Sequence, residues 1–481
     1  MIRIFFIVII FFISTLKIKS QSLNVQIIDS ITKQPIAFTN IYFSNNNGLI
    51  SDDEGNFELI KSQLSQNDSM YVSMIGYNKK SFSINNFNDT IITLIQSPIK
   101  LSDVYLTNKK LNSQEIISKV IENIENNYEK GFSKNKIYLN RSSNSITEKF
   151  ELSKFKSTIT EINKNLIDSI LSNVSKQNKY QLETLSYYYG SYHPENQKIQ
   201  LIKARETYEK ANEVLKSLNQ KMEDAFKNEV KKDSYFKIKS GIFKTDLDVD
   251  GIEEVDSTNV ESVKKFEEKK LKDKHEFANE QRNIIYNFYK LLFFNENSDL
   301  NFILKPNRYI FSESRIELLG NDIVYLINCT PKGKDKYSAT LYINTENYAI
   351  VRLDFTNIKP LSNFKLLGIS NNIYLREGKI ILSKFNNEKY NLSYVKINYG
   401  QRVGFDRNIK LIEKNKNVKG RRKQNQISFD MDLKVNVKVI TELQIFESDK
   451  ISEENFENVD HKNSVMPEYL KEFTTNFWEE F

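Results

Sequence analysis

The sequence predicts a multidomain α+β protein with an N-terminal antiparallel β-sandwich, a central helical region and a C-terminal antiparallel β-sheet. Three observations predict this. Short apolar strands separated by Gly, Asn and Pro fill residues 21–107. Apolar residues at helical spacing recur in residues 108–300, and alternation with a period of two dominates residues 301–450. The length of 481 residues is enough for several domains.

Residues 1–20 are predicted to be a secretory signal peptide. Arg3 supplies the positive charge, and an unbroken apolar run follows from Ile4 to Ile13. That run is shorter than the roughly 20 apolar residues of a membrane-spanning helix. Ser20 is a small residue suited to the position before a cleavage site. We therefore expect an exported protein of the periplasm or outer membrane, with a retained N-terminal anchor as the alternative.

Composition excludes some classes of function. The chain has 69 Lys and Arg against 62 Asp and Glu, and because these charges are dispersed we expect no nucleic-acid partner. The one concentrated basic run, residues 416–423, suits a solvated loop or a peripheral contact with an anionic membrane. The single Cys329 excludes internal disulfides. It lies in an apolar stretch and is expected to be buried.

Turn residues set the order of strands in residues 21–107. Pro35 fixes a first turn, an Asn-rich hairpin ends at Gly48, and an acidic turn ends at Gly55. Between these turns the apolar alternation predicts strands at residues 25–27, 37–43, 57–59, 70–75, 81–84 and 90–95.

These residues resemble the carboxypeptidase regulatory-like domain of secreted and outer-membrane proteins of Bacteroidetes. The matching pieces are Asp29, Thr32 and Pro35, then residues 51–57 (SDDEGNF), then residues 72–77 (VSMIGY). The resemblance implies a transthyretin-like β-sandwich that serves as a non-catalytic accessory module.

Three helices are predicted in the central region, at residues 113–129, 201–230 and 260–294, with a strand at 235–243. In the second of them Leu201, Ala204 and Tyr208 begin a seam of apolar residues spaced three and four apart. This pattern is typical of a long amphipathic helix packed on its own domain. A coiled-coil partner surface is the alternative.

One acidic segment has the spacing of half a calcium loop. Asp246, Asp248 and Asp250 place oxygen donors at alternate positions before Gly251. The twelfth position is Ser257, where a calcium loop needs a bidentate Glu. We therefore favour a solvated acidic turn over a metal site, and we expect no cofactor.

Strands with a period of two follow one another from Arg308 to Ile397, and residues 428–446 predict a further long strand or hairpin. Residues 337–355 are similar to the strands of lipoprotein-carrier half-barrels, which wrap a curved sheet around acyl chains. The tail, residues 451–481, is expected to end in an amphipathic helix at 467–481 that carries Trp478.

No catalytic constellation is visible. His193, His275 and His461 are isolated and fall in no H-E-x-x-H motif, so the zinc chemistry of a peptidase has no ligands here. The tyrosine cluster at residues 187–192 suits either a strand or a stacking surface for a sugar or peptide. The chain is more consistent with a binding protein than with an enzyme.

Three functions stay open. The first is an exported, non-enzymatic envelope protein that binds or scaffolds an unknown envelope partner. The second is a carrier of lipid or another apolar ligand, which a hollow apolar face in residues 308–446 favours and a filled core there disfavours. The third is a hydrolase with carboxylates assembled by the fold, which requires a cleft with paired Asp or Glu of raised pKa.

Overall fold

A computed structural model describes residues 22–36, 39–43, 48–51, 54–60, 68–74, 77–95, 111–193, 196–208, 213–231, 234–248, 260–319, 322–384, 389–417, 423–460 and 465–471. The described residues divide into two units. One holds residues 22–95 and 316–324. The other holds residues 111–315 and 325–471.

The first unit contains a β-sandwich, as predicted. Its elements are β1 (Ser22–Asp29), β2 (Asn40–Phe43), β3 (Gly48–Ile50), β4 (Asn56–Ile60), β5 (Ser69–Ser73), β6 (Lys80–Ser83), η2 (Ile84–Asn86) and β7 (Ile91–Leu94). One sheet has the order β4-β1-β7 and the other β3-β2-β5-β6. Strand β1 pairs with β7 in parallel, so the expectation of a wholly antiparallel sandwich is wrong for this pair. Alternating residues such as Val25, Ile27, Met70 and Val72 are buried in one core.

The motif residues of this unit hold its turns. The carboxylate of Asp29 accepts hydrogen bonds from the backbone N–H groups of Ile31 and Thr32, both at 2.7 Å. Its second oxygen accepts from the Tyr77 hydroxyl at 2.7 Å. Gly55 has φ +74°, and a Cβ there would lie 2.6 Å from the Ile27 carbonyl oxygen, so only glycine fits. These residues therefore serve the fold.

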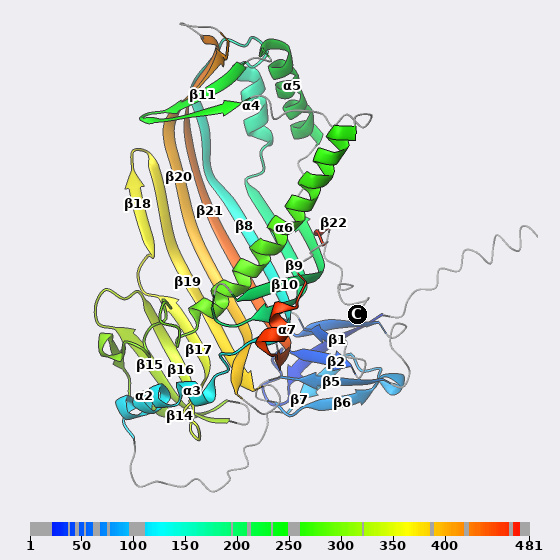
Figure 1. The fold of residues 1–481 in the computed structure, drawn as a ribbon, viewed down its shortest axis with the longest axis vertical. Coiled ribbons are helices and arrows are strands. Elements are labelled where there is room, and N and C mark those ends of the chain that lie inside the picture. The colour runs from blue at the N-terminus through cyan, green and yellow to red at the C-terminus, as the bar shows by residue number, and fades with distance from the viewer. Residues whose placement is uncertain are drawn as a thin grey trace, which may run out of the picture. The chain divides into compact units, whose positions relative to one another are not determined.

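Most of the remaining described residues belong to one large sheet (Figure 1). Its strands are β8 (Ser133–Ser157), β9 (Gln177–Gly190), β10 (Gln197–Tyr208), β11 (Ser234–Ser240), β12 (Phe243–Asp248), β13 (Tyr309–Phe311), β14 (Arg315–Leu319), β15 (Asp322–Pro331), β16 (Tyr337–Asn344), β17 (Ile350–Asn357), β18 (Ser362–Leu366), β19 (Ile369–Lys384), β20 (Tyr390–Asn415), β21 (Lys423–Lys450) and β22 (Glu468–Leu470). The main order is β13-β15-β16-β17-β19-β20-β21-β8-β9-β10-β22, with β11–β12 beside β20, β14 beside β15 and β18 beside β19.

The helices are α2 (Ser113–Glu122), α3 (Ile124–Asn127), α4 (Lys164–Asn173), α5 (Glu213–Glu229), α6 (Val260–Leu291) and α7 (Glu453–Glu457), with η3 at Pro306–Arg308. Helix α6 matches the prediction for residues 260–294, and α2 and α3 match the prediction for 113–129. Helices α4 and α5 share a small core with the far end of the sheet, made of Ile159, Ile162, Ala225 and Ile427. Within the described chain, no helix has both the length and the apolar character needed to cross a membrane.

Residues 108–300 were expected to be mixed and mainly helical; besides α2–α6 they contain the long strands β8, β9 and β10, which were not predicted. The predicted helix at 201–230 divides into the end of β10 and the separate helix α5. A β-bulge between Leu201 and Lys203 causes the error, since it shifts the strand's alternation by one residue. The resulting spacing of three between Leu201 and Ala204 imitates a helix.

The C-terminal prediction is also corrected in part. Residues 468–470 form strand β22, which pairs in parallel with β10, where a helix was expected. Residues 472–481, including Trp478, lie outside the described residues. Residues 428–446 belong to β21, a single strand of 28 residues.

Candidate functional site

The two sides of the long strands differ sharply in chemistry. Residues paired directly across neighbouring strands point to the same side of a sheet, and successive residues alternate. One side, called here the apolar face, carries apolar residues of β19, β20, β21 and β8: Ile369, Ile373, Val403, Phe405, Ile409, Met431, Leu433, Val435, Val437, Val439, Phe150 and Leu152.

The opposite side, called here the charged face, carries Asp406, Lys410, Asp430, Asp432, Lys434, Lys438, Lys149 and Glu151. Ion pairs link several of these residues. The Lys149 ammonium lies 2.6 Å from Asp432 and 3.1 Å from Glu151, and Lys154 lies 2.8 Å from Asp430. Most charge thus lies on one side of these strands; Arg407, opposite Met431, and Arg141, opposite Thr441, are exceptions on the apolar face.

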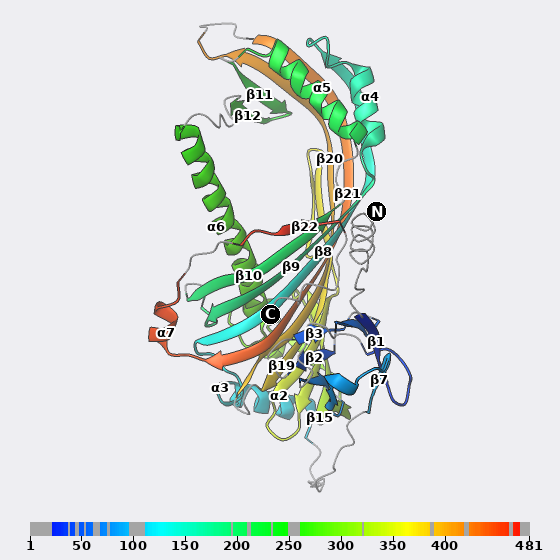
Figure 2. The ribbon, with the colours of Figure 1, turned by 90° about the vertical axis from the view of Figure 1, so that its right-hand side faces the viewer.

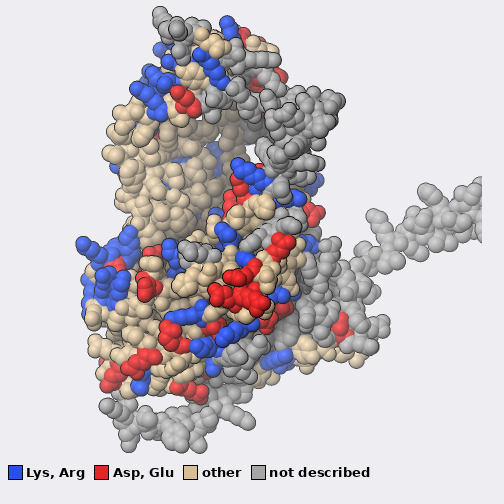
Figure 3. Space-filling view, in the orientation of Figure 1, with Lys and Arg blue, Asp and Glu red and all other residues tan. Residues whose placement is uncertain are grey.

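The apolar face lies on the hollow side of the sheet. Figure 2 shows the long strands bending around the side on which α6 lies. Where α6 crosses, the apolar face is filled: Ile137, Val395, Leu443 and Ile445 are buried there. Further along the strands, residues of the apolar face such as Ile369, Phe405 and Val439 are half-exposed. Figure 3 shows a hollowed surface here with few charged side chains.

A buried polar cluster lies where α6 meets β8 and β9. Thr184, Ser186 and Tyr188 occupy alternate positions on the same side of β9, and Asn135 pairs with Tyr188 across the strands. The ring of Tyr188 stacks on Tyr289 of α6, with centroids 5.5 Å apart and an interplanar angle of 7°. The remaining member, Gln281, is buried two turns earlier on α6.

Six polar atoms of this cluster have no hydrogen-bond partner among the described residues: Asn135 Oδ1, Thr184 Oγ1, Ser186 Oγ, Tyr188 OH, Gln281 Oε1 and Tyr289 OH. An unpartnered buried polar group costs about 1–3 kcal/mol. Burial raises the pKa of the hydroxyls of Tyr188 and Tyr289 far above the usual value, so both stay protonated donors. The cluster is therefore suited to neutral groups that donate and accept hydrogen bonds, water included.

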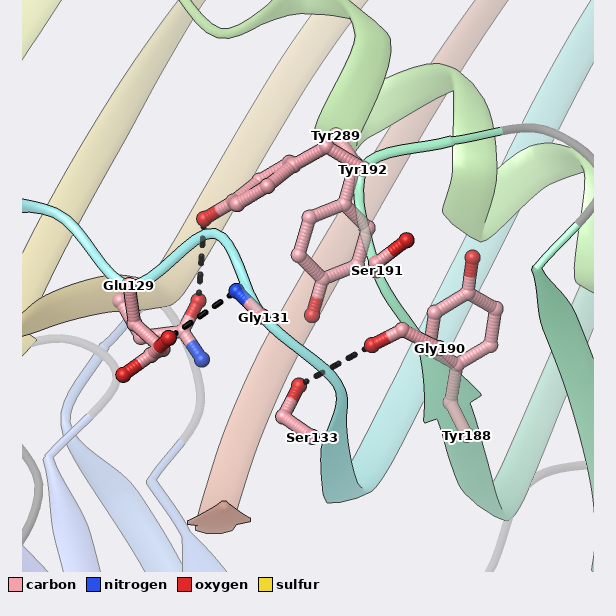
Figure 4. A pocket seen from close by; sticks show the side chains of 9 residues that line it. Glu129, Gly131, Ser133, Tyr188, Gly190, Ser191, Tyr192 and Tyr289 are labelled. Carbon is pink, nitrogen blue, oxygen red and sulfur yellow. Dashed lines mark hydrogen bonds between the residues drawn. The ribbon is translucent and has the colours of Figure 1, made fainter. Parts of the chain in front are cut away.

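Figure 4 shows a small pocket at one end of this cluster. The hydroxyls of Tyr188 and Tyr289 point in opposite directions, and the Tyr192 hydroxyl donates to Asn391 at 3.4 Å. Glu129, Ser133 and Gly190 complete the wall. The space fits roughly one water molecule, too little for an organic substrate.

The residues singled out by sequence lie in different environments. In the tyrosine cluster, Tyr188 and Tyr192 turn inward to Tyr289, so they pack against α6 and offer no stacking surface. Cys329 is buried, as expected, and burial raises the pKa of its thiol far above the usual value. Residues 418–422 of the basic run lie outside the described residues.

The acidic segment proposed for calcium is only partly described. Asp246 and Asp248 belong to strand β12, and Asp246 lies 3.4 Å from the Lys237 ammonium. Asp250 lies outside the described residues. Among the residues described, no group of three or more metal-ligating side chains converges.

The buried carboxylates do not form a pair. Glu183 accepts from Arg205 Nε at 2.6 Å and from the Tyr138 hydroxyl at 2.7 Å. Glu413 accepts from Ser234 Oγ at 2.7 Å and from Asn425 Nδ2 at 2.8 Å. Each carboxylate is satisfied by hydrogen-bond donors, which favours a structural role over catalysis.

Sequence reasoning missed the uncovered half of the apolar face and the polar cluster. The alternation of residues 431–439 (MDLKVNVKV) did mark a two-sided strand. No signal in the sequence says that the apolar side lacks a covering element. The cluster depends on α6 lying against β9, which periodicity alone cannot predict.

The first unit, with its two sheets and its Asp29–Tyr77 hydrogen bond, is a small β-sandwich module. The CarboxypepD_reg-like domain family matches residues 26–106, so this part of the chain is a CarboxypepD_reg-like domain, as the motifs predicted.

Solved structures with partial similarity were also found. A protein described as an outer membrane lipoprotein-sorting protein domain, from Vibrio parahaemolyticus, has 9% identity and a TM-score of 0.22, covering 71% of this chain and 95% of its own. A membrane-associated protein of unknown function from Bacteroides fragilis has 7% identity and a TM-score of 0.12, covering 88% and 97%. Scores this low do not indicate a shared fold, and nothing about function is inferred from them. No curated protein matches the chain.

Proposed function

We propose that the chain is an exported, non-enzymatic cell-envelope protein that binds an extended apolar ligand, such as the acyl chain of a lipid, on the apolar face. The observation that carries this proposal is the uncovered half of that face. On β21, a strand of 28 residues, every charged residue from Asp430 to Lys438 lies on the other side. Export is supported by the N-terminal apolar run and by the CarboxypepD_reg-like domain.

Energetics favour an occupant for this surface. Apolar area removed from water contributes about 25 cal/mol per Å². Phe405, Leu433 and Val437 are half-exposed neighbours on two long strands, so a ligand laid along them removes area from several residues at once. Contiguous exposed apolar surface of this kind typically marks a binding site.

The chemistry of the face favours an acyl chain over a peptide. The backbone groups of β19, β20, β21 and β8 are engaged in long ladders that are interrupted only at β-bulges. An extended peptide lying there would leave its own N–H and C=O groups without partners, which is costly away from water. A hydrocarbon chain has no such groups and matches a surface of aliphatic and Phe side chains.

The test compares two neighbouring residues on β21. Val437 lies on the apolar face and Lys438 on the charged face. Val437→Asp should weaken binding of a fluorescent fatty acid roughly tenfold or more, because a carboxylate in contact with hydrocarbon is poorly solvated. Lys438→Asp, the matched control, should leave the affinity unchanged. Equal affinities in both variants and the unaltered chain, or no measurable binding at all, would contradict the proposal.

A further inference from the structure

Two hairpin turns meet at one edge of the large sheet. The β18–β19 turn at Leu367–Gly368 faces the β11–β12 turn at Gly241–Ile242 (Figure 1). Both are fixed to adjacent residues of β20. The Asp406 N–H donates to the Gly368 carbonyl at 2.7 Å, and Arg407 Nη2 donates to the Ser240 carbonyl at 2.6 Å.

The two tips expose large apolar side chains. Ile242 is 74% exposed, Phe243 52%, Phe364 46%, Leu366 56% and Leu367 54%. Single exposed apolar residues are ordinary, but five on two adjoining turns are not. Phe364 and Leu366 also lie on the apolar face, because their partners Asn371 and Ile369 pair with Val403 and Phe405.

Leu367 is expected to destabilise its turn. It has φ +50°, in the left-handed region that favours Gly and Asn and is uncommon for other residues, bulky ones above all. Two-residue hairpin turns of this kind prefer Asn before Gly. An exposed leucine is therefore kept here at a cost in local stability, which is typical of a residue retained for binding.

The charged face at the same edge carries a row of like charges. Lys239 pairs directly with Lys244 on one side and with Lys410 on the other, so three lysines face the same side on adjacent strands. Like charges placed opposite each other destabilise a sheet. The nearest acid on β12, Asp246, is already paired with Lys237 at 3.4 Å. An anionic surface would relieve this repulsion.

We propose that these two hairpin tips dock on the surface of an anionic phospholipid bilayer. Ile242 and Leu367 would enter the region of the headgroups and first acyl carbons, while Lys239, Lys244 and Lys410 would face lipid phosphates. The docking proposal depends only on the two hairpin tips. Its consequence, that an acyl chain passes from bilayer to apolar face along Phe364 and Leu366, rests on the proposed function.

The test is flotation of the full chain with phosphatidylcholine vesicles, with or without phosphatidylglycerol. The unaltered chain should float with the anionic vesicles. The double variant Ile242→Asn/Leu367→Asn should lose about tenfold or more of its partitioning, because two inserted side chains are removed. Lys239→Gln should reduce the difference between the fraction of protein that floats with anionic vesicles and the fraction that floats with pure phosphatidylcholine vesicles. Asn suits the left-handed turn, so the double variant should remain folded.

Ile310→Asn is the matched control, because Ile310 is 58% exposed on β13, at another edge of the sheet, and should not affect flotation. Unchanged flotation of the double variant would overturn the proposal. So would a dimer that the double variant dissociates, with no vesicle binding by the unaltered chain. Fatty-acid binding measured on the same proteins keeps the two proposals separate, since the double variant should retain it.

Discussion

The two halves of the long strands β20 and β21 differ in how far their apolar side is buried. Toward the end of the sheet on which α6 packs through Tyr289 and Tyr188, Val395 and Leu443 are completely buried. Ten residues away on each strand, Phe405 and Leu433 point to the same side and are half-exposed. The alternation of apolar and polar residues is the same in both halves. It determines which side of a strand is apolar, while a separate element determines whether that side is covered.

The largest expected effect compares the two leucines of β21. Leu443→Ala should lower the free energy of unfolding by about 2–5 kcal/mol, because it leaves a cavity in a filled core. Leu433→Ala should cost less than about 1 kcal/mol, because water already reaches that site. Urea denaturation of the full chain measures both. Equal losses would mean that the two halves are equally packed.

The next comparison concerns buried tyrosine hydroxyls. The Tyr128 hydroxyl accepts from the Ile350 N–H at 2.6 Å and donates to the Ile350 carbonyl at 3.2 Å. Tyr128→Phe should therefore cost about 1–2 kcal/mol of stability. Tyr188→Phe should cost nothing or stabilise slightly, because it removes an unpartnered hydroxyl.

This pair of variants also shows whether the polar cluster is filled in solution. If Tyr188→Phe destabilises the chain as much as Tyr128→Phe, then a water or ligand group satisfies the Tyr188 hydroxyl. The cluster would then be occupied in solution.

The sequence predicted the first unit better than the large sheet. Residues such as Asp29, Gly55 and Tyr77 act through local turns, so their spacing is visible in the chain. In β8, residues 142–145 (SSNS) carry no apolar alternation, yet they extend the strand because β21 and β9 pair with it on both sides. Such pairing depends on residues far away in sequence.

The candidate site was foreseen only as an alternative. A long strand or hairpin was predicted at residues 428–446, and the carrier hypothesis depended on a hollow apolar face in residues 308–446. The course of α6 and the meeting of two hairpin turns at Arg407 are tertiary features that no local pattern encodes.

The smallest expected effect lies on the charged face of the uncovered half. Hydrogen bonds from Lys154 first, and then Asn408, lower the pKa of the Asp430 carboxyl below its usual value. A carboxyl with a lowered folded-state pKa stabilises the fold above its unfolded pKa, and this contribution is lost as the pH falls through the folded pKa. Asp430→Asn should thus lower stability slightly at neutral pH.

The same variant should match the unaltered chain once the pH falls below the folded-state pKa of Asp430, where the carboxyl is protonated. Urea denaturation at the two pH values measures the difference. A loss that persists in acid would mean that Asp430 contributes by packing instead of by charge.

The most direct measurement of the central claim is photo-crosslinking with a diazirine-bearing fatty acid, followed by peptide mapping of the labelled chain. If the uncovered apolar face binds acyl chains, labels should fall on residues 369–373, 401–409 and 429–439, and excess unlabelled fatty acid should abolish them. Labels confined to the charged face or to the CarboxypepD_reg-like domain, or labels that unlabelled fatty acid does not compete away, would contradict the claim.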